Sequence, residues 1–336
     1  MRVSKKLALC LMSSAGAFRI GRRLSRGFLL VVTYHRVITG TPKGIRPPNS
    51  VFTSEFAQQI EYLVRHYHVV TGEEVRLFLC GKGSLPQNSV LITFDDGYEN
   101  NFSQAFPILQ RNRVSAAFFL TTGLVGQITE TLWFDKIDSM LSTNPLLTVL
   151  AHLRTLGLPK TVHNGNGIKT WIKQLSQQRR ETIVDAAARR FLMDNHHQTE
   201  ATKLMTWDHV REMANAGMTF GSHTVTHQIL SSASPEELKQ ELVKSRLKIE
   251  KETGQACWCF AYPNGESSDF RASDQRALQA AGYECAFTQV PGFITSKTDH
   301  YALPRIPIPD SSDIRVFASR VSGVHHWLQR GISSHG

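Results

Sequence analysis

The chain has 336 residues, 41% of them hydrophobic and 20% charged, a globular composition that excludes an intrinsically disordered protein and suits one large domain or two ordinary ones. Its formal net charge of +10 would suit an acidic partner, but outside the N-terminus the basic residues are scattered and form no finger, basic-zipper or RNP-type motif, so we expect no nucleic-acid partner. The five cysteines are an odd number without zinc-knuckle spacing, which argues against a disulfide scaffold and favours a reducing compartment.

The segment 1–27 is basic and has apolar residues at helical spacing. Its apolar stretch is weak and is followed at once by RIGRRLSRG, a pattern that suits a cleaved export signal poorly. Leu7, Leu11, Phe18 and Leu24, set against the basic residues, are typical of an amphipathic helix that lies on anionic lipid. No apolar run is long enough to span a bilayer. We expect a cytoplasmic protein or one peripheral to the inner membrane, with export left open.

Apolar runs rich in β-branched residues then alternate with helical patterns. FLLVVTYHRV (28–37) predicts a buried strand, a helical pattern follows at 54–67, and SVLITFDD (89–96) predicts the next strand. The alternation returns after residue 204 and includes a long helix over 235–253. About seven strands separated by helices predict parallel β/α units closed into a barrel.

The alternation breaks between 127 and 203, where the patterns are helical and polar. We expect an inserted helical subdomain or lid in this region. The barrel itself is then expected to comprise 28–126 and 204–315, with a C-terminal helix and tail over 316–336.

Polar residues stand at the ends of several predicted strands. They occur in YHRV (34–37), TFDDG (93–97), GSHTVTH (221–227) and AYPNG (261–265). Because the carboxyl ends of parallel strands meet at one end of a β/α barrel, we expect these side chains to converge on a common mouth.

Two histidines and two aspartates among these residues have the types and spacing of a metal centre. His223 and His227 stand four residues apart, so both imidazoles can reach one ion, and one carboxylate from Asp95 or Asp96 would complete a site for Zn²⁺ or a similar divalent metal. The other carboxylate would then be free to act as a general base. Taken separately, HxxxH pairs are common on surfaces and DDG is an ordinary turn, so the combination at strand ends carries the prediction.

TFDDG together with HTVTH resembles the first two motifs of the polysaccharide deacetylases, the NodB-homology or carbohydrate esterase family 4 enzymes, over about 28–126 and 204–309. The resemblance implies an α/β fold, a distorted (β/α)7-type barrel with an inserted helical subdomain. It also implies one divalent metal ion, expected to be Zn²⁺, and hydrolysis of N-acetyl groups on glycans. Carried over residue by residue, it makes Asp95 the catalytic base and makes Asp96, His223 and His227 the metal ligands.

The third family motif departs from its usual R-P-P-Y-G form. Here AYPNG places Ala261 in the Arg position and Asn264 in the Tyr position, so the base lacks its usual orienting partner. The backbone N–H of Asn264 could still stabilise an oxyanion. Tyr262 is a candidate for substrate contact, and Arg305 in LPRIPI is a candidate replacement for the missing Arg.

The late Leu-x-His motif that supplies the family's general acid is absent near the C-terminus. The early YHRV instead resembles the arrangement in poly-N-acetylglucosamine deacetylases, where the acid histidine comes from the first strand. His35 is therefore the candidate general acid, and a structural histidine at a strand end is the alternative.

These features predict a metal-dependent hydrolase that removes N-acetyl groups from an amino sugar of a cell-envelope polysaccharide or a lipid-linked glycan. One alternative is an amidohydrolase of the same fold that acts on a small non-sugar amide. Another is a carbohydrate-binding member with impaired catalysis, motivated by the missing Arg but opposed by the intact Asp95. In the predicted insertion, Trp133, Phe134 and Trp171 could stack on sugar rings, although buried aromatic residues are the commoner case.

Overall fold

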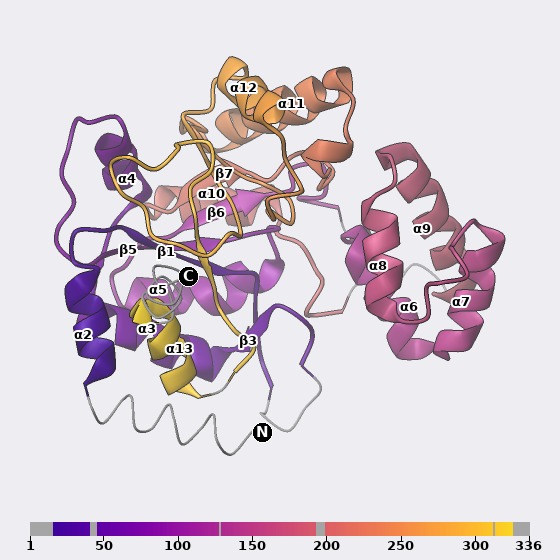
Figure 1. Ribbon diagram of the computed structural model, residues 1–336, viewed down its shortest axis with the longest axis horizontal. Coiled ribbons are helices and arrows are strands. Elements are labelled where there is room, and N and C mark those ends of the chain that lie inside the picture. Colours follow the sequence, from indigo (N-terminus) through magenta and orange to yellow (C-terminus); the bar gives the residue numbers. More distant parts are fainter. Residues whose placement is uncertain (1–15, 41–45, 128, 193–198, 312, 325–336) are drawn as a thin grey trace, which may run out of the picture.

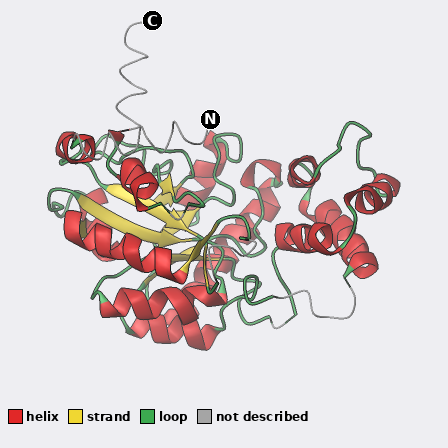
Figure 2. Cartoon of the chain, turned by 90° about the horizontal axis from the view of Figure 1, so that it is seen from below, coloured by secondary structure: helices red, strands yellow, loops and turns green. Residues whose placement is uncertain are grey.

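The computed structural model describes residues 16–40, 46–127, 129–192, 199–311 and 313–324. Its main body is a curved parallel sheet surrounded by helices (Figures 1 and 2). Seven strands follow the order β10-β1-β5-β6-β7-β8-β9, and β4 pairs with β5 beside this path. A parallel bridge between Phe287 and Leu303 continues the pairing from β9 toward β10. The predicted distorted (β/α) barrel is confirmed.

The strands of this sheet are short. Their bounds are β1 Leu30–Tyr34, β4 His68–Val69, β5 Ser89–Phe94, β6 Ala117–Leu120, β7 Thr219–Ser222, β8 Cys259–Ala261, β9 Cys285–Phe287 and β10 Ile306–Pro307. All their pairings are parallel. A separate parallel pair consists of β2 Arg36–Ile38 and β3 Ser50–Phe52. The apolar run 28–37 thus forms two strands, interrupted at His35.

Both faces of the central strands are buried, which explains their nearly continuous apolar sequences. One face packs against the outer helices and includes Phe94 and Phe118, whose rings stack with centroids 4.7 Å apart. The alternate residues fill the barrel interior, where Phe119 and Phe287 belong to a second apolar cluster. This alternation decides which residues of each strand can reach the barrel interior.

Helices of the main body connect successive strands, and a last helix follows β10. They are α3 Thr53–His66, α4 Gly72–Leu79, α5 Phe106–Arg111 (preceded by a π-helical turn, Asn101–Ala105), α10 Trp207–Asn215, α11 Pro235–Thr253, α12 Ala272–Ala280 and α13 Ile314–Val321. The bounds of α11 match the predicted helix. Ser234 caps its N-terminus by accepting a hydrogen bond from the Glu237 N–H, and Gly254 ends it with φ of 67°.

The predicted inserted helical subdomain is also confirmed. It contains α6 Trp133–Thr143, α7 Leu146–Thr155, α8 Gly165–Lys173 and α9 Gln177–Phe191, which lie beside the barrel in Figure 1. These helices share their own apolar core, which includes Ile137, Leu153, Ile172 and Val184. The exact limits of the insertion and of the barrel segments stay predictions.

The described part of the N-terminal segment forms α2 Ala17–Leu24, which packs on the main body. Phe18 is buried, and Gly21 lies so close to Ser322 and Val324 that a side chain there would clash. Ile20 and Leu24 are exposed on the opposite face. Among the described residues, no helix combines the length and apolar character needed to cross a bilayer. Leu7 and Leu11 of the predicted amphipathic helix lie outside the described residues.

Candidate active site

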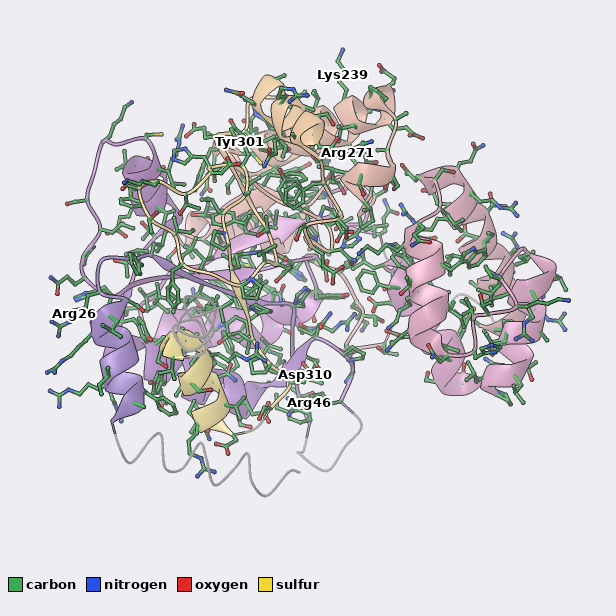
Figure 3. All side chains as sticks on the ribbon, in the orientation of Figure 1. Arg26, Arg46, Lys239, Arg271, Tyr301 and Asp310 are labelled. Carbon is green, nitrogen blue, oxygen red and sulfur yellow. The ribbon has the colours of Figure 1, made fainter. Side chains whose placement is uncertain are left out.

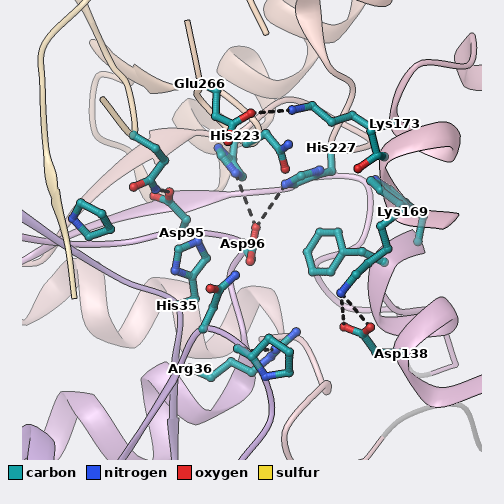
Figure 4. Close-up of a pocket in the computed structure, with 18 of the residues that line it drawn as sticks. His35, Arg36, Asp95, Asp96, Asp138, Lys169, Lys173, His223, His227 and Glu266 are labelled. Carbon is teal, nitrogen blue, oxygen red and sulfur yellow. Dashed lines mark hydrogen bonds and ion pairs between the residues drawn. The ribbon is translucent and has the colours of Figure 1, made fainter. Parts of the chain in front are cut away.

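Strand β5 ends in two carboxylates that have different partners. Asp95 continues the strand and donates its N–H to the Tyr34 carbonyl at 3.0 Å. Asp96 has a φ of 77° and Gly97 a φ of 86°, so the chain leaves the strand direction between the two aspartates. As a result Asp95 pairs with Arg305, whereas Asp96 faces His223 and His227 (Figure 4).

His223 and His227 reach Asp96 from the loop that leaves β7. Their Nε2 atoms lie 3.5 and 3.4 Å from Asp96 Oδ1. Thr224 and His227 both have positive φ values, 68° and 59°, which fold the HTVTH segment into a tight turn. The Glu241 carboxylate on α11 holds this turn by accepting hydrogen bonds from the Val225 and Thr226 N–H groups at 2.7 and 3.0 Å.

The geometry of these three side chains fits one divalent ion. All three are buried, and their ligand atoms lie within 4.8 Å of one another, so the described residues include a possible Asp-His-His metal cluster. Atoms bound about 2.0–2.2 Å from a common ion in tetrahedral geometry lie roughly 3.3–3.6 Å apart, a range that includes the two distances from Asp96 to the histidines. The Nδ1 atom of His223 contacts the Ala261 carbonyl at 2.7 Å, an arrangement that makes Nδ1 the donor and leaves Nε2 free for a metal.

Both aspartates are held in the ionised form. Burial alone would raise the pKa of Asp95, but the Arg305 guanidinium, together with His223, outweighs burial and lowers it. For Asp96 burial also acts upward, and the interactions with His223 and His227 bring its pKa well below the usual value. Asp95 is therefore an available proton acceptor at neutral pH, and Asp96 an available anionic ligand.

Arg305 forms a buried bidentate pair with Asp95. Its Nη1 and Nη2 atoms lie 2.8 and 2.7 Å from Oδ1 and Oδ2, and its Nε donates to the Thr288 carbonyl at 2.9 Å. The guanidinium lies over the Phe119 ring inside the barrel, and Ala261 belongs to the same interior cluster as Phe119. The alanine side chain at position 261 has no hydrogen-bond donor, and Arg305 supplies the guanidinium from a position next to β10.

Of the three remaining predicted site residues, two lie at the site and one does not. His35 and Asn264 line the same cavity as Asp95 and Asp96. Asn264 has a φ of 64°, and among the described residues no hydrogen bond engages its backbone N–H. Tyr262 is buried outside the cavity, where its ring stacks on Phe270 and its hydroxyl donates to the Tyr301 carbonyl. The structure therefore does not bring Tyr262 to the site with the others.

A cavity of about 550 Å³ contains this site. Its floor holds His35, Asp95, Asp96 and the two metal-site histidines, and one wall comes from the helical insertion. That wall includes residues that carry no functional signal in the sequence, among them Asp138 and Lys169. Gln289 also lines the cavity and donates to Asp95 Oδ2 at 3.0 Å. Gln289 stands two residues after β9, and this position at a strand end is the sequence signal for it.

A buried polar cluster fixes the insertion beside the site. Arg36, next to His35, forms an ion pair with Asp135 of α6, and both side chains are at most 3% exposed. The Tyr98 hydroxyl donates to Asp135 at 2.8 Å and also accepts from Arg36. Burial raises the pKa of Asp135 to about 6, an effect that Arg36 opposes. The insertion is thus attached through the residue adjoining the candidate general acid.

We expect Asp135→Ala to lower the free energy of unfolding by about 3–5 kcal/mol, because it leaves the buried Arg36 guanidinium without its ion-pair partner. Urea denaturation measures this change. The matched control is Asp185→Ala, which removes a 47%-exposed carboxylate paired with Lys136 on the same insertion and should change stability by less than about 1 kcal/mol. Equal, small losses in the two variants would show that the Arg36–Asp135 pair does not anchor the insertion.

Solved structures share this fold. The Streptococcus pyogenes deacetylase PplD in complex with acetate aligns with a TM-score of 0.59 at 19% identity, covering 88% of this chain and 99% of that one. IcaB from Ammonifex degensii aligns with a TM-score of 0.57 at 20% identity, covering 88% and 97%. At these identities the likeness shows a common fold.

Sequence comparisons give the family. YxkH of Bacillus subtilis, a protein named for polysaccharide deacetylation, is 20% identical over 297 residues, which cover 88% of this chain and 77% of the relative. The poly-beta-1,6-N-acetyl-D-glucosamine N-deacetylase of Staphylococcus aureus is 37% identical over 78 residues, only 23% of this chain and 27% of that relative. The polysaccharide deacetylase model matches residues 82–286, more than half of the sequence. The chain therefore belongs to the polysaccharide deacetylase family, as the TFDDG and HTVTH motifs indicated.

Proposed function

We propose that the protein is a metal-dependent deacetylase that hydrolyses the N-acetyl group of an amino sugar within a glycan. The observation that carries this proposal is the separation of two adjacent carboxylates into two environments. Asp96 faces two imidazoles in the geometry of a metal site, and Asp95 is held ionised beside it by Arg305. Metal-assisted amide hydrolysis uses a Lewis acid and a proton acceptor, and this arrangement supplies residues to hold the first and to act as the second.

The predicted site residues at the mouth of the barrel have separate roles in this reaction. A divalent ion such as Zn²⁺, held by Asp96, His223 and His227, would polarise the acetyl carbonyl and activate water. Asp95 accepts a proton from the water molecule while the water oxygen bonds to the acetyl carbonyl carbon. The Asn264 backbone N–H donates to the oxygen on which negative charge develops. A proton must also reach the amine nitrogen as the carbon–nitrogen bond breaks.

His35 is the proposed donor of that proton. We expect His35→Ala to lower kcat by about 10²- to 10⁴-fold while leaving the fold and the metal content unchanged, because an unprotonated amine is a poor leaving group. Burial lowers the pKa of His35 against the opposing effect of Asp96 and Asp95. As pH rises, its protonated fraction, and with it the His35-dependent rate, should therefore fall at a lower pH than for an ordinary histidine. Steady-state kinetics over a pH series measure both effects. A near-normal kcat would return His35 to the structural alternative.

The substrate class is proposed as an N-acetylated glycan, or a lipid-linked glycan, of the cell envelope. Support comes from the named activity of the Staphylococcus aureus relative on an N-acetylglucosamine polymer and from aromatic side chains in the cavity wall. The test is acetate release from a panel of N-acetylated oligosaccharides, glycolipids and small non-sugar amides, each with and without chelator. Chelator-sensitive release from glycans supports the proposal, whereas release only from non-sugar amides favours the amidohydrolase alternative.

We also propose that α2 contacts anionic membrane. Ile20 and Leu24 are each 56% exposed and lie beside exposed Arg19 and Arg23, and Arg26 points away from the body in Figure 3. Apolar side chains surrounded by arginine suit the boundary of a negatively charged bilayer. Phe18 packs with Tyr62 of α3 and Ala318 of α13, so α2 lies against the outer helices of the barrel, and none of its residues lines the cavity.

Flotation with vesicles tests this contact. Ile20→Ser combined with Leu24→Ser should reduce binding to vesicles that contain anionic lipid, and high salt should weaken what remains. The control is Leu247→Ser on α11, since Leu247 is also 56% exposed but lies outside α2. Equal flotation of all three proteins, or equal binding to neutral vesicles, would argue against a membrane role for α2.

A further inference from the structure

The wall of the cavity next to the metal-site residues is made by the insertion helices α6 and α8. Phe134 and Asp138 come from α6, and Lys169 and Thr170 from α8. In Figure 4, dashed lines join Lys169 to Asp138, and both residues line the same cavity as Asp96. None of these residues belongs to the motifs that identify the family, and the proposed chemistry does not use them.

This wall is apolar close to the metal site and polar farther along. The Phe134 ring meets the His227 imidazole edge to face, with centroids 5.2 Å apart. Beyond it, Lys169 Nζ lies 2.8 and 3.2 Å from the two carboxylate oxygens of Asp138. A sugar ring offers both kinds of surface, since its C–H face packs on aromatic groups and its hydroxyls both donate and accept hydrogen bonds.

The charges of the wall are compensated. Lys169 is paired with Asp138, and Lys173 contacts Asp269 at 2.7 Å and Glu266 at 3.2 Å. An ammonium has three donors and a carboxylate about four acceptor sites, so a partly exposed pair retains free capacity for hydroxyl groups. The Lys169 and Asp138 side chains are 27% and 31% exposed, which leaves them within reach of a ligand. Paired charges of this kind suit an uncharged ligand better than an anion.

The wall is also held at a fixed place relative to the metal site. Asp135, beside Phe134, is bound to Arg36 of the barrel. Arg180 of α9 is 2% exposed and donates to Gln228, the residue after His227, at 2.5 Å. Because buried contacts on both sides of the site join insertion and barrel, the Lys169–Asp138 pair has a defined position relative to Asp96.

From these contacts we propose that the α6–α8 wall is a subsite for a second, uncharged sugar ring, linked to the ring that loses its acetyl group. Phe134 supplies its apolar contact, and the Lys169–Asp138 pair binds its hydroxyl groups. The cavity volume of about 550 Å³ lies within the usual range of roughly 300–1,000 Å³ for small-ligand sites, so the site suits a short stretch of glycan. This inference rests on the proposed function and narrows its substrate to neutral N-acetylated oligosaccharides.

Binding measurements separate this subsite from catalysis. Calorimetry would use the Asp95→Asn protein, with N-acetylglucosamine and its β-1,4- and β-1,6-linked dimers as probes. We expect at least one dimer to bind more tightly than the single sugar. Adding Lys169→Ala or Asp138→Ala should reduce that preference by roughly ten- to hundredfold, the range for lost hydrogen bonds to charged groups. Their combination should reduce it little further, because the two side chains act as a pair.

The matched control is Lys136→Ala on α6. Lys136 pairs with Glu130 and Asp185 outside the cavity, so this variant should keep the dimer preference. Equal affinity of the parent for single sugar and dimers, or an unchanged preference in Lys169→Ala, would overturn the subsite. So would tighter, strongly salt-dependent binding of a dimer that carries a carboxylate. A retained dimer preference with no acetate release by the wild-type protein would instead support the subsite and contradict the proposed function.

Discussion

Replacing His223 and His227 together by Ala is expected to remove the bound divalent ion and reduce acetate release to background. The two Nε2 atoms are two of the three protein donors at the proposed centre, and Asp96 alone would bind an ion weakly. Metal analysis of purified protein should find about one ion per chain in the parent, as expected for one such site. The double variant should contain almost none.

The matched control is His68→Ala with His209→Ala, which removes two histidines that do not line the cavity. It should keep both metal and activity. If the metal content of the His223/His227 variant equals that of the parent, the ion binds elsewhere and the assignment of Asp96, His223 and His227 is wrong.

Substitutions in the Asp95–Arg305 pair should distinguish the loss of the catalytic base from a change in the pKa of that base. Asp95→Asn should lower kcat by about 10²- to 10⁴-fold and keep the metal, because the side chain no longer accepts a proton but is not among the proposed ligands. Arg305→Ala should act differently. With the guanidinium gone, burial remains and raises the pKa of Asp95, so activity should disappear at a higher pH than in the parent as the solution is acidified.

The pH dependence of kcat/KM measures this shift. Arg305→Lys is the conservative comparison, since it keeps a positive charge but not the bidentate pair, and its acidic limit should lie between those of the parent and Arg305→Ala. Circular dichroism checks that each variant is folded, because Arg305 is fully buried. A uniform loss of activity at every pH would mean that Arg305 supports only the fold and does not set the protonation of Asp95.

The parts of the site predicted from sequence were those encoded in short segments. Apolar runs that end in polar residues located β5 and β7, and the carboxyl ends of parallel strands necessarily meet. These two features predicted that Asp95, Asp96, His223 and His227 lie together at the mouth of the barrel. The separate environments of Asp95 and Asp96 depend on the positive φ of Asp96, which a DDG sequence permits but does not impose.

Tyr262 shows what the motif comparison overlooked. Side chains alternate along a strand, so Cys259 and Ala261 of β8 face the barrel interior, while Phe260 and Tyr262 pack toward the outer helices. The alternation can be predicted from the sequence, and it indicates that position 261, not Tyr262, faces the barrel interior. Arg305 could be named as a candidate only because position 261 lacks an Arg. Its contact with Asp95 joins residues 210 positions apart, a separation that no local pattern encodes.

The polar contacts of the insertion could not be predicted from the sequence. Its helical character followed from periodicity, but Arg36 and Asp135 are 99 positions apart, and Asp138 and Lys169 lie on different helices. Of the three aromatic residues considered, Trp133 and Phe134 line the cavity, whereas Trp171 packs in the core of the insertion. Such contacts depend on how the helices dock, which is set by tertiary packing.

The central claim is that a divalent ion held by Asp96, His223 and His227 is required for deacetylation. Acetate release before and after the metal is removed and restored tests this claim most directly. Purified protein would be treated with chelator, dialysed, and assayed on N-acetylglucosamine oligomers before and after one equivalent of Zn²⁺ is added. The account predicts loss of acetate release on chelation and recovery on addition in the parent, with no recovery in the His223→Ala, His227→Ala double variant. Acetate release that persists in fully metal-free protein, or that Zn²⁺ restores equally in the double variant, would contradict it.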